Sequence, residues 1–283
     1  MPFTDIDGIP TRYEVTGSGP PLLMFSPGGF DAALENWRTQ GIYRRLRLLD
    51  HLAEAYTCVT FDKREAGRSG GRLERVTWAD YAAQGLGLLD HLGIRRAHLL
   101  GGCVGCSTAV ALAVRRPERV RSLVLYAPAG GVKYRRKQHD RFARHLAYVA
   151  EHGLGSVVEL ARSTGAGFSA DPRVGPWAAV LRTDPAFAES YAKAGADRYR
   201  ILAGGMARHL FDRDTVPGAE PDDLLALDVP ALVVPGEDES HAPSAARYLQ
   251  ECLPRSAYWD AAVADQTEST APARVRKFLE ENP

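Results

Sequence analysis

The sequence predicts an α/β fold in which a mostly parallel β-sheet is covered by helices on both faces. Strand-like apolar runs alternate with helix-like segments along most of the chain, and this alternation is typical of a parallel sheet. Segment 128–228 differs, because it has a helical composition and no apolar run that resembles a buried strand. We therefore expect a core made of residues 1–127 and 229–283, with residues 128–228 inserted as a helical cap.

Six apolar runs supply the expected strands, and three segments supply the clearest helices. The strands are expected at residues 21–25, 57–61, 97–100, 122–126, 230–234 and, more weakly, 257–259. Helices are expected after Thr77, at 107–114 and at 272–281. Thr77 and Asp80 have the spacing of a capping box, and apolar residues follow at helical spacing. Gly85 and Gly87 weaken that helix because glycine is a poor helix former.

The turn between the strand at 97–100 and the next helix contains the pattern G-x-C-x-G, with Cys103 at its centre. This pattern resembles a nucleophile elbow, in which glycines let strand and helix pack closely around a strained central residue. The helix N-terminus favours an anion there, so we expect a lowered pKa for the Cys103 thiol. The alternative is a buried, inert cysteine in an ordinary turn.

The overall composition argues against several classes of partner. Thirty-five basic and thirty-five acidic residues leave the 283-residue chain with no net charge, so no bulk field favours nucleic acid or a membrane surface. The N-terminus lacks the pattern of a signal peptide, and no apolar run reaches the roughly 18 residues of a membrane span. Four scattered cysteines are too few for a disulfide framework. We expect a cytoplasmic protein that acts on a small molecule, and a homodimer is left open.

Four local patterns together resemble the α/β-hydrolase superfamily, and the resemblance covers nearly the whole chain outside the cap. They are residues 26–29 (SPGG), 61–69 (FDKREAGRS), the Cys103 turn, and 234–239 (VPGEDE). The resemblance implies a sheet of about eight strands with a helical cap. It also implies that the N–H of Val104, with one from Gly28 or Gly29, binds an oxyanion.

The sequence departs from the family pattern at the acid and at the histidine. The acid position falls on Glu239, with Asp238 beside it, and either carboxylate can orient an imidazole. The alternative is that both are solvated loop charges. The family's histidine precedes the last helix, but no histidine follows His241 in this chain, and Asp265 or Gln266 occupies that position. Both residues are therefore candidates for the lining of the pocket.

His241 is the best substitute for the missing base. It lies two residues after Glu239, at the carboxyl end of an expected strand, where open α/β sheets bind ligands. Histidine is also a common surface residue, so a ring that points into solvent is the alternative. The cap histidines stay open as well: His139, His145, His152 and His209.

Other features have both structural and functional interpretations. Cys103 and Cys106 have the spacing of a redox motif, although an elbow explains the nearby glycines and a dithiol does not. No further cluster of cysteine and histidine has metal-ligand spacing, so no metal is expected. The basic start of the cap favours a solvated helix face over a site for an acidic substrate. Trp177 is a candidate for the lining of an apolar pocket or for the cap's own core.

These residues predict hydrolysis of an ester, lactone or thioester. Cys103 would attack the carbonyl carbon, and His241, oriented by Glu239 or Asp238, would transfer the proton. No cofactor is expected. Two alternatives are a cofactor-independent lyase or isomerase on the same fold, and a ligand-binding member without catalysis.

Overall fold

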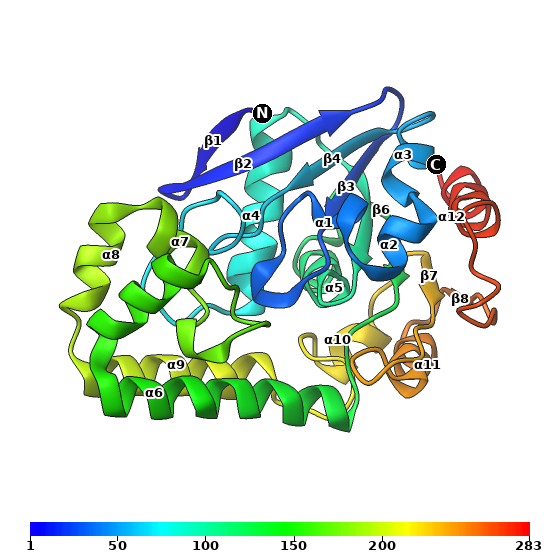
Figure 1. Ribbon diagram of the computed structural model, residues 1–283. Helices are drawn as coiled ribbons and strands as arrows, with labels where there is room; N and C mark the ends of the chain where they lie inside the picture. The colour runs from blue at the N-terminus through cyan, green and yellow to red at the C-terminus, as the bar shows by residue number, and fades with distance from the viewer.

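The computed structural model describes residues 1–283 and contains one sheet of eight strands (Figure 1). The strands are β1 (Phe3–Ile6), β2 (Ile9–Thr16), β3 (Pro21–Phe25), β4 (Thr57–Phe61), β5 (Ala97–Gly102), β6 (Val120–Tyr126), β7 (Ala231–Val234) and β8 (Ser256–Tyr258). Their spatial order is β1-β2-β4-β3-β5-β6-β7-β8. All neighbouring pairs from β4 to β8 are parallel. The predicted α/β fold with a mostly parallel sheet of about eight strands is confirmed.

The N-terminal hairpin of β1 and β2 is not among the strands that the sequence predicts. It adds to the sheet edge, where β2 runs antiparallel to β4 with Tyr13 opposite Phe61. In this hairpin Ile6 and Ile9 are buried while Phe3 is 48% exposed. The core covers only part of these edge strands, so their sequences contain no continuous apolar run. Such a run is the signal by which a buried strand is predicted.

Each central strand sends alternate side chains into two separate cores, one on each face of the sheet. Along β3, Leu23 and Phe25 pack in the larger cluster, whereas Leu22 and Met24 pack in the smaller one. Since both faces are covered, β3 is apolar throughout its length. This two-sided burial is the reason that the central strands are predictable from sequence.

Helices cover both faces of the sheet. They are α1 (Asn36–Thr39), α2 (Gly41–Leu46), α3 (Leu48–Leu52), α4 (Trp78–His91), α5 (Gly105–Arg115), α6 (Val132–Thr164), α7 (Ala178–Thr183), α8 (Pro185–Ala192), α9 (Ala196–Leu210), α10 (Pro221–Leu225), α11 (Pro243–Cys252) and α12 (Thr270–Glu280), with 3₁₀ turns η1 (Gly29–Asp31), η2 (Pro117–Arg119) and η3 (Pro172–Val174). Leu88 of α4 belongs to the larger core, and Leu46 of α2 and Phe278 of α12 belong to the smaller one. Thus α4 and α2 lie on opposite faces.

Between β6 and β7 the chain leaves the sheet and forms α6 to α10, which we call the helical insertion (residues 128–228). Figure 1 shows α6 and α9 side by side along the edge of the molecule, and the two helices are in contact. Gly153 interrupts α6 with a non-helical backbone. No helix, α6 included, is both long enough and apolar enough to cross a membrane.

The local start signal at Thr77 is confirmed. Thr77 is the N-cap of α4, and its hydroxyl accepts a hydrogen bond from the Asp80 N–H at 3.3 Å. The Asp80 carboxylate in turn accepts from the Thr77 N–H at 2.7 Å. This reciprocal pair satisfies two N–H groups that a helix start otherwise leaves free.

Candidate active site

The turn between β5 and α5 holds Cys103 in a left-handed backbone conformation. Its φ is 56°, which is uncommon for a residue with a side chain and marks a locally strained turn. The turn is fixed by a hydrogen bond of 3.1 Å from the Cys103 N–H to the Tyr126 carbonyl. A side chain at Gly105 would collide with the carbonyl oxygen of Phe25. The glycine after the cysteine is therefore required for the helix to start so close to β3.

The loop after β7 brings an imidazole and a carboxylate together. His241 Nδ1 lies 2.8 Å from Asp238 Oδ2 and 2.9 Å from Oδ1. The Asp238 carboxylate also accepts the Ser240 N–H at 2.7 Å. The Gly130 N–H, which follows β6, donates to the Ser240 carbonyl at 3.0 Å and ties this loop to the neighbouring strand end. His241 is thus held by Nδ1, with Nε2 left for another partner.

Nε2 of His241 is buried and has no partner in standard hydrogen-bond geometry, but the ring acts electrostatically on Cys103. Burial raises the pKa of the Cys103 thiol, while the His241 ring and the N–H groups of Gly28 and Val104 outweigh burial and lower it. For His241, burial lowers the pKa, but Cys103 and Asp238 raise it to about 9. These opposite shifts move the pair towards a thiolate and an imidazolium. Catalytic contacts of this kind are often loose before substrate binds.

Two backbone N–H groups help to lower the pKa of the Cys103 thiol, one from Gly28 after β3 and one from Val104 at the start of α5. Gly28 has φ 120°, and a side chain there would collide with Asn36. Donors on both sides of a nucleophile form the arrangement that stabilises a developing oxyanion. Of the two glycines that the sequence offers, the geometry places Gly28 at the sulfur. Gly29 lines a neighbouring cavity instead.

A cavity of about 490 Å³ lies over Cys103, Asp238 and His241. Its other walls include Tyr43 of α2 and Val263 of the loop after β8. The volume is within the usual range for small-molecule sites, which is about 300–1,000 Å³. Sequence reasoning missed the contribution of Tyr43, because its short helix carries no clear periodic signal.

Glu239 does not orient the histidine. Its side chain is 71% exposed, and its carboxylate lies 3.4 Å from Lys133 Nζ at the start of α6. Asp238, one residue earlier, supplies the carboxylate at the imidazole. The loop turns between the two residues, so neighbouring carboxylates point to different surroundings.

Gln266 lies in the loop before the last helix, where the family pattern places its histidine, and it has a structural role in this chain. Gln266 is fully buried and accepts a hydrogen bond of 2.8 Å from the Tyr126 hydroxyl. Its amide donates to the carbonyls of Pro235 and Ala261 at 3.0 and 3.1 Å. Asp265 is exposed. Neither side chain lines the cavity over Cys103, so the expectation that they line the pocket is wrong.

We expect Gln266→Ala to lower the free energy of unfolding by about 2–4 kcal/mol, because three hydrogen bonds of a buried side chain are lost and a cavity forms. Urea denaturation measures this loss. Asp265→Ala, at an exposed position, should change it by no more than about 0.5 kcal/mol. If Gln266→Ala instead keeps its stability and loses activity, Gln266 belongs to the reaction.

Trp177 and His145 also lie away from Cys103. Trp177 is fully buried in the helical insertion, packs on Tyr191 and Tyr199, and donates its indole N–H to the Arg72 carbonyl at 2.9 Å. His145 hydrogen-bonds the Tyr199 hydroxyl at 2.5 Å. The interpretation of Trp177 as part of the insertion's own core is therefore the one that the packing supports.

Cys106 has a different environment from Cys103, although only two residues separate them. Its thiol donates to the Gly101 carbonyl at 3.1 Å. Burial and the nearby Cys103 raise the pKa of this thiol well above its usual value. A protonated, buried thiol is a poor nucleophile.

The environments of the cysteines predict selective alkylation. Cys103 should react with iodoacetamide at pH 7 much faster than Cys58, whose pKa burial raises to about 12, and faster than Cys106. The measurement is peptide mapping by mass spectrometry after timed quenching. Equal labelling of Cys103 and Cys252, which is partly exposed, would contradict an activated thiolate.

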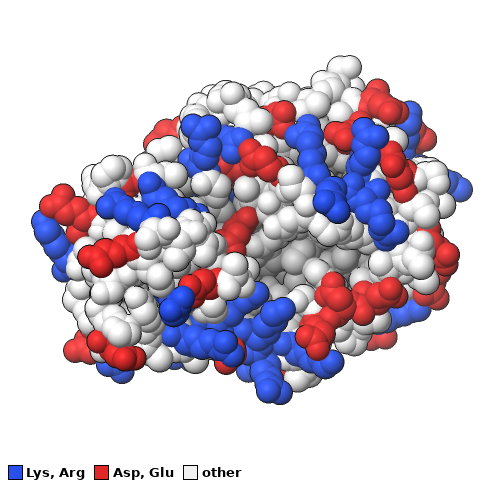
Figure 2. Space-filling view, in the orientation of Figure 1, with Lys and Arg blue, Asp and Glu red and all other residues white.

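Basic side chains gather along α6 near this site. Figure 2 shows Lys and Arg over the lower edge of a face that is hollowed above them. Lys133 pairs with Glu239, Arg135 with Asp214 at 3.1 Å, and Arg144 with Asp140 at 2.9 Å. Exposed pairs of this kind are typical of a solvated helix face, as the sequence favours.

Known proteins share both sequence and fold with this chain. A sequence of Cupriavidus necator, the dihydrolipoyllysine-residue acetyltransferase component of an acetoin cleaving system, is 39% identical over 128 residues, 45% of this chain and 32% of that protein. The 2-hydroxymuconate semialdehyde hydrolase of Pseudomonas sp. CF600 is 36% identical over 128 residues, 44% of this chain and 41% of that protein. The chain thus matches less than half the length of these two curated relatives.

The similarity of fold extends over the whole chain. The crystal structure of the enol-lactonase from Burkholderia xenovorans LB400 superimposes with a TM-score of 0.62 at 21% identity, and covers 99% of this chain and 100% of that one. The sequence profile of the alpha/beta hydrolase fold family matches residues 21–262. With its parallel sheet, its strained turn after β5 and this match, the chain belongs to the α/β-hydrolase fold family.

Proposed function

We propose that this chain is a cysteine hydrolase of ester-type bonds, whose substrate is an ester, a lactone or a thioester. Cys103 is the nucleophile, His241 is the proton carrier and Asp238 orients His241. The observation that carries the proposal is that Cys103, His241 and Asp238 line one cavity, with Asp238 bound to Nδ1 of the His241 ring. The lowered Cys103 pKa and the raised His241 pKa agree with it. The hydrolases among the relatives support the same reaction class.

In the first half of the reaction the Cys103 thiolate attacks the carbonyl carbon. The carbonyl oxygen becomes an oxyanion that accepts hydrogen bonds from the N–H groups of Gly28 and Val104. The tetrahedral intermediate then collapses, the bond to the leaving group breaks, and His241 Nε2 gives its proton to that leaving group. The product is an acyl group joined to Cys103 as a thioester.

In the second half a water molecule replaces the leaving group. The neutral His241 takes a proton from the water, and the resulting hydroxide attacks the thioester carbonyl. The same two N–H groups bind the oxyanion. Expulsion of the Cys103 thiolate releases the carboxylic acid and restores the pair with protonated His241. No cofactor takes part in either half.

Trapping of the acyl group tests this function. In His241→Ala the thiol still attacks an activated p-nitrophenyl ester, but deacylation lacks its base and becomes slow. We expect intact-mass spectrometry after acid quenching to show one added acyl group, on the peptide that contains Cys103.

The double variant Cys103→Ala/His241→Ala is the matched control and should carry no adduct. Release of p-nitrophenol by Cys103→Ala at the wild-type rate, without an adduct in His241→Ala, would overturn the proposal. A lyase or isomerase reaction, or ligand binding without turnover, would then be the function to examine with non-ester ligands.

A further inference from the structure

A second charged group lies in the same part of the fold and takes no part in the proposed reaction. Lys63 follows β4 and is only 9% exposed. Its ammonium lies 4.0 Å from the centre of the Tyr81 ring and 5.1 Å from that of Phe30. Burial of a lone ammonium is costly, so an amine in this position calls for a compensating partner.

The protein itself does not supply a direct counter-ion to Lys63. Its ammonium makes no hydrogen bond or ion pair, and the two carboxylates whose charges act on it have other partners. Glu65 pairs with Arg64 at 2.8 Å, and Asp31 accepts two backbone N–H groups from the insertion. Burial lowers the pKa of Lys63 to about 8, against the opposing effect of Glu65 and Asp31. At pH 7 the side chain is therefore mainly charged.

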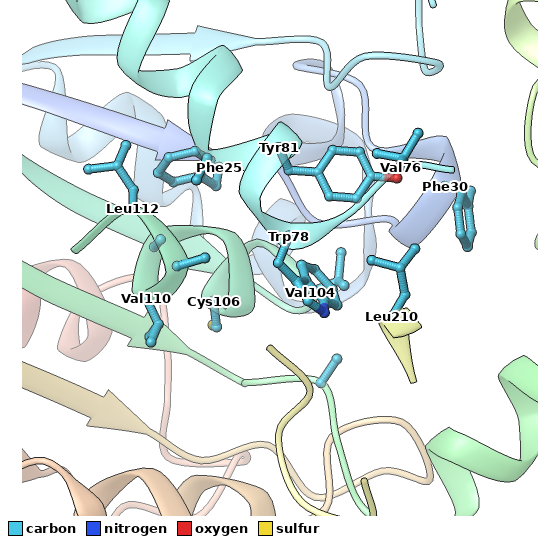
Figure 3. Packing of buried hydrophobic residues seen from close by; sticks show 14 of the residues in the cluster. Phe25, Phe30, Val76, Trp78, Tyr81, Val104, Cys106, Val110, Leu112 and Leu210 are labelled. Atoms are coloured by element: carbon cyan, nitrogen blue, oxygen red, sulfur yellow. The ribbon is translucent and has the colours of Figure 1, made fainter. Parts of the chain in front are cut away.

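Lys63 faces a small cavity with mostly apolar walls. The cavity measures about 20 Å³, more than the room that one water needs. Figure 3 shows how Phe30, Trp78, Tyr81 and Val104 gather there from three segments of the chain, which are η1, α4 and the turn before α5, with Leu210 at the end of α9. Lys63 is the one charged side chain in this lining, and its positive charge would be complemented by an anion.

This cavity adjoins the proposed reaction centre. Gly29 and Val104 line it, and their chain neighbours Gly28 and Cys103 line the larger cavity. Strands β4, β3 and β5 are adjacent in the sheet, so the ends of β4 and β5 lie two strand spacings apart, about 10 Å. Tyr134 of α6 lines the cavity, and burial followed by the charge of Cys103 raises the pKa of its phenol.

We infer that Lys63 binds a carboxylate at the far end of the substrate's acyl group. The substrate class is then an ester, thioester or lactone of a short dicarboxylic acid, with one carboxyl at Cys103 and the other at Lys63. This inference rests on the proposed function, because it assumes that the acyl carbonyl lies at Cys103. The carboxylate supplies the missing counter-ion, and the aromatic walls exclude the water that would weaken the pair.

Matched substrates test the inference. The p-nitrophenyl ester of succinic acid carries a free carboxylate, and its methylated form presents a neutral acyl group of similar shape. We expect wild type to have a higher kcat/KM for the charged ester. Lys63→Met should lower kcat/KM for the charged ester by about 10- to 100-fold, as for loss of a charged hydrogen bond, and leave the neutral ester within about twofold. Lys63→Arg, which keeps the charge, should retain part of the preference.

A second measurement does not need turnover. Monomethyl glutarate, which has one carboxylate, should slow the alkylation of Cys103 by iodoacetamide in wild type but not in Lys63→Met. Dimethyl glutarate, which has no carboxylate, should protect both proteins weakly and equally. Equal unfolding temperatures of wild type and Lys63→Met would exclude a folding defect. If Lys63→Met is unstable, the protection of Cys103 is compared between wild type and Lys63→Gln instead.

The possible failures are distinguishable. If wild type hydrolyses both esters through Cys103 with no preference, or if Lys63→Met keeps the preference, the inference is overturned and the proposed function stands. If both esters are hydrolysed without Cys103, the proposed function fails. In that case, protection of Cys103 by monomethyl glutarate that depends on Lys63 would still support the anion site, and its absence would overturn it.

Discussion

Replacing Cys103 with alanine is expected to lower kcat/KM for ester-type substrates by about 10⁴-fold or more, because the proposed reaction has no other nucleophile at the carbonyl. The residual rate would come from binding and from the N–H groups of Gly28 and Val104. Initial rates with a p-nitrophenyl ester, corrected for spontaneous hydrolysis, measure the loss. The fold should persist, since the side chain is partly exposed and alanine is smaller.

Cys103→Ser separates a thiolate mechanism from a simple loss of volume. A serine hydroxyl is not ionised at neutral pH and depends on the base far more than a thiol does, so we expect a loss similar to that of alanine. Cys252→Ala in α11 is the matched control and should keep the wild-type rate. Wild-type turnover by Cys103→Ala would exclude an acyl-enzyme on this residue.

His241→Ala is expected to lower kcat by about 10²- to 10⁴-fold for a substrate with a poor leaving group, the usual contribution of a general acid and base. The loss should be smaller for acylation by a p-nitrophenyl ester, whose leaving group needs no proton. Without the imidazolium, the pKa of Cys103 should also rise, because the ring is the main influence that opposes burial. Alkylation rates measured against pH report this rise directly.

The same pair predicts the pH profile of kcat/KM. Activity should persist below the usual thiol pKa, since the pKa of Cys103 is lowered and the thiolate is present there. It should fall as pH rises through about 9, where His241 loses the proton that the leaving group needs. Asp238→Asn removes an interaction that raises the His241 pKa, so its alkaline limb should move to lower pH.

Glu239→Gln is the matched control for Asp238→Asn, because the two carboxylates are neighbours in the chain and only Asp238 contacts the ring. Its profile should coincide with that of wild type. A profile that shifts in Glu239→Gln and not in Asp238→Asn would assign the orienting role to Glu239 and contradict the geometry of the loop.

Much of the fold is predictable because central strands and capped helices carry local signals. The run at β3 is apolar on both faces. The side chains of Thr77 and Asp80 each accept a hydrogen bond from the other residue's backbone N–H, within one helical turn. The hairpin of β1 and β2 has no such signal, since its burial depends on pairing with β4, which is distant in sequence. Tyr43 was missed for a similar reason, because a helix as short as α2 shows no periodicity.

The sequence by itself determined the strained turn around Cys103, because its glycines and its place between a strand and a helix are properties of a few consecutive residues. Only the tertiary structure decided which groups meet the sulfur. Asp238 and Glu239 have the same charge and adjacent positions, and the path of one loop directs the first to His241 and the second to Lys133. The environment of Lys63 was equally hidden, since an ammonium loses its hydration only where distant segments close around it.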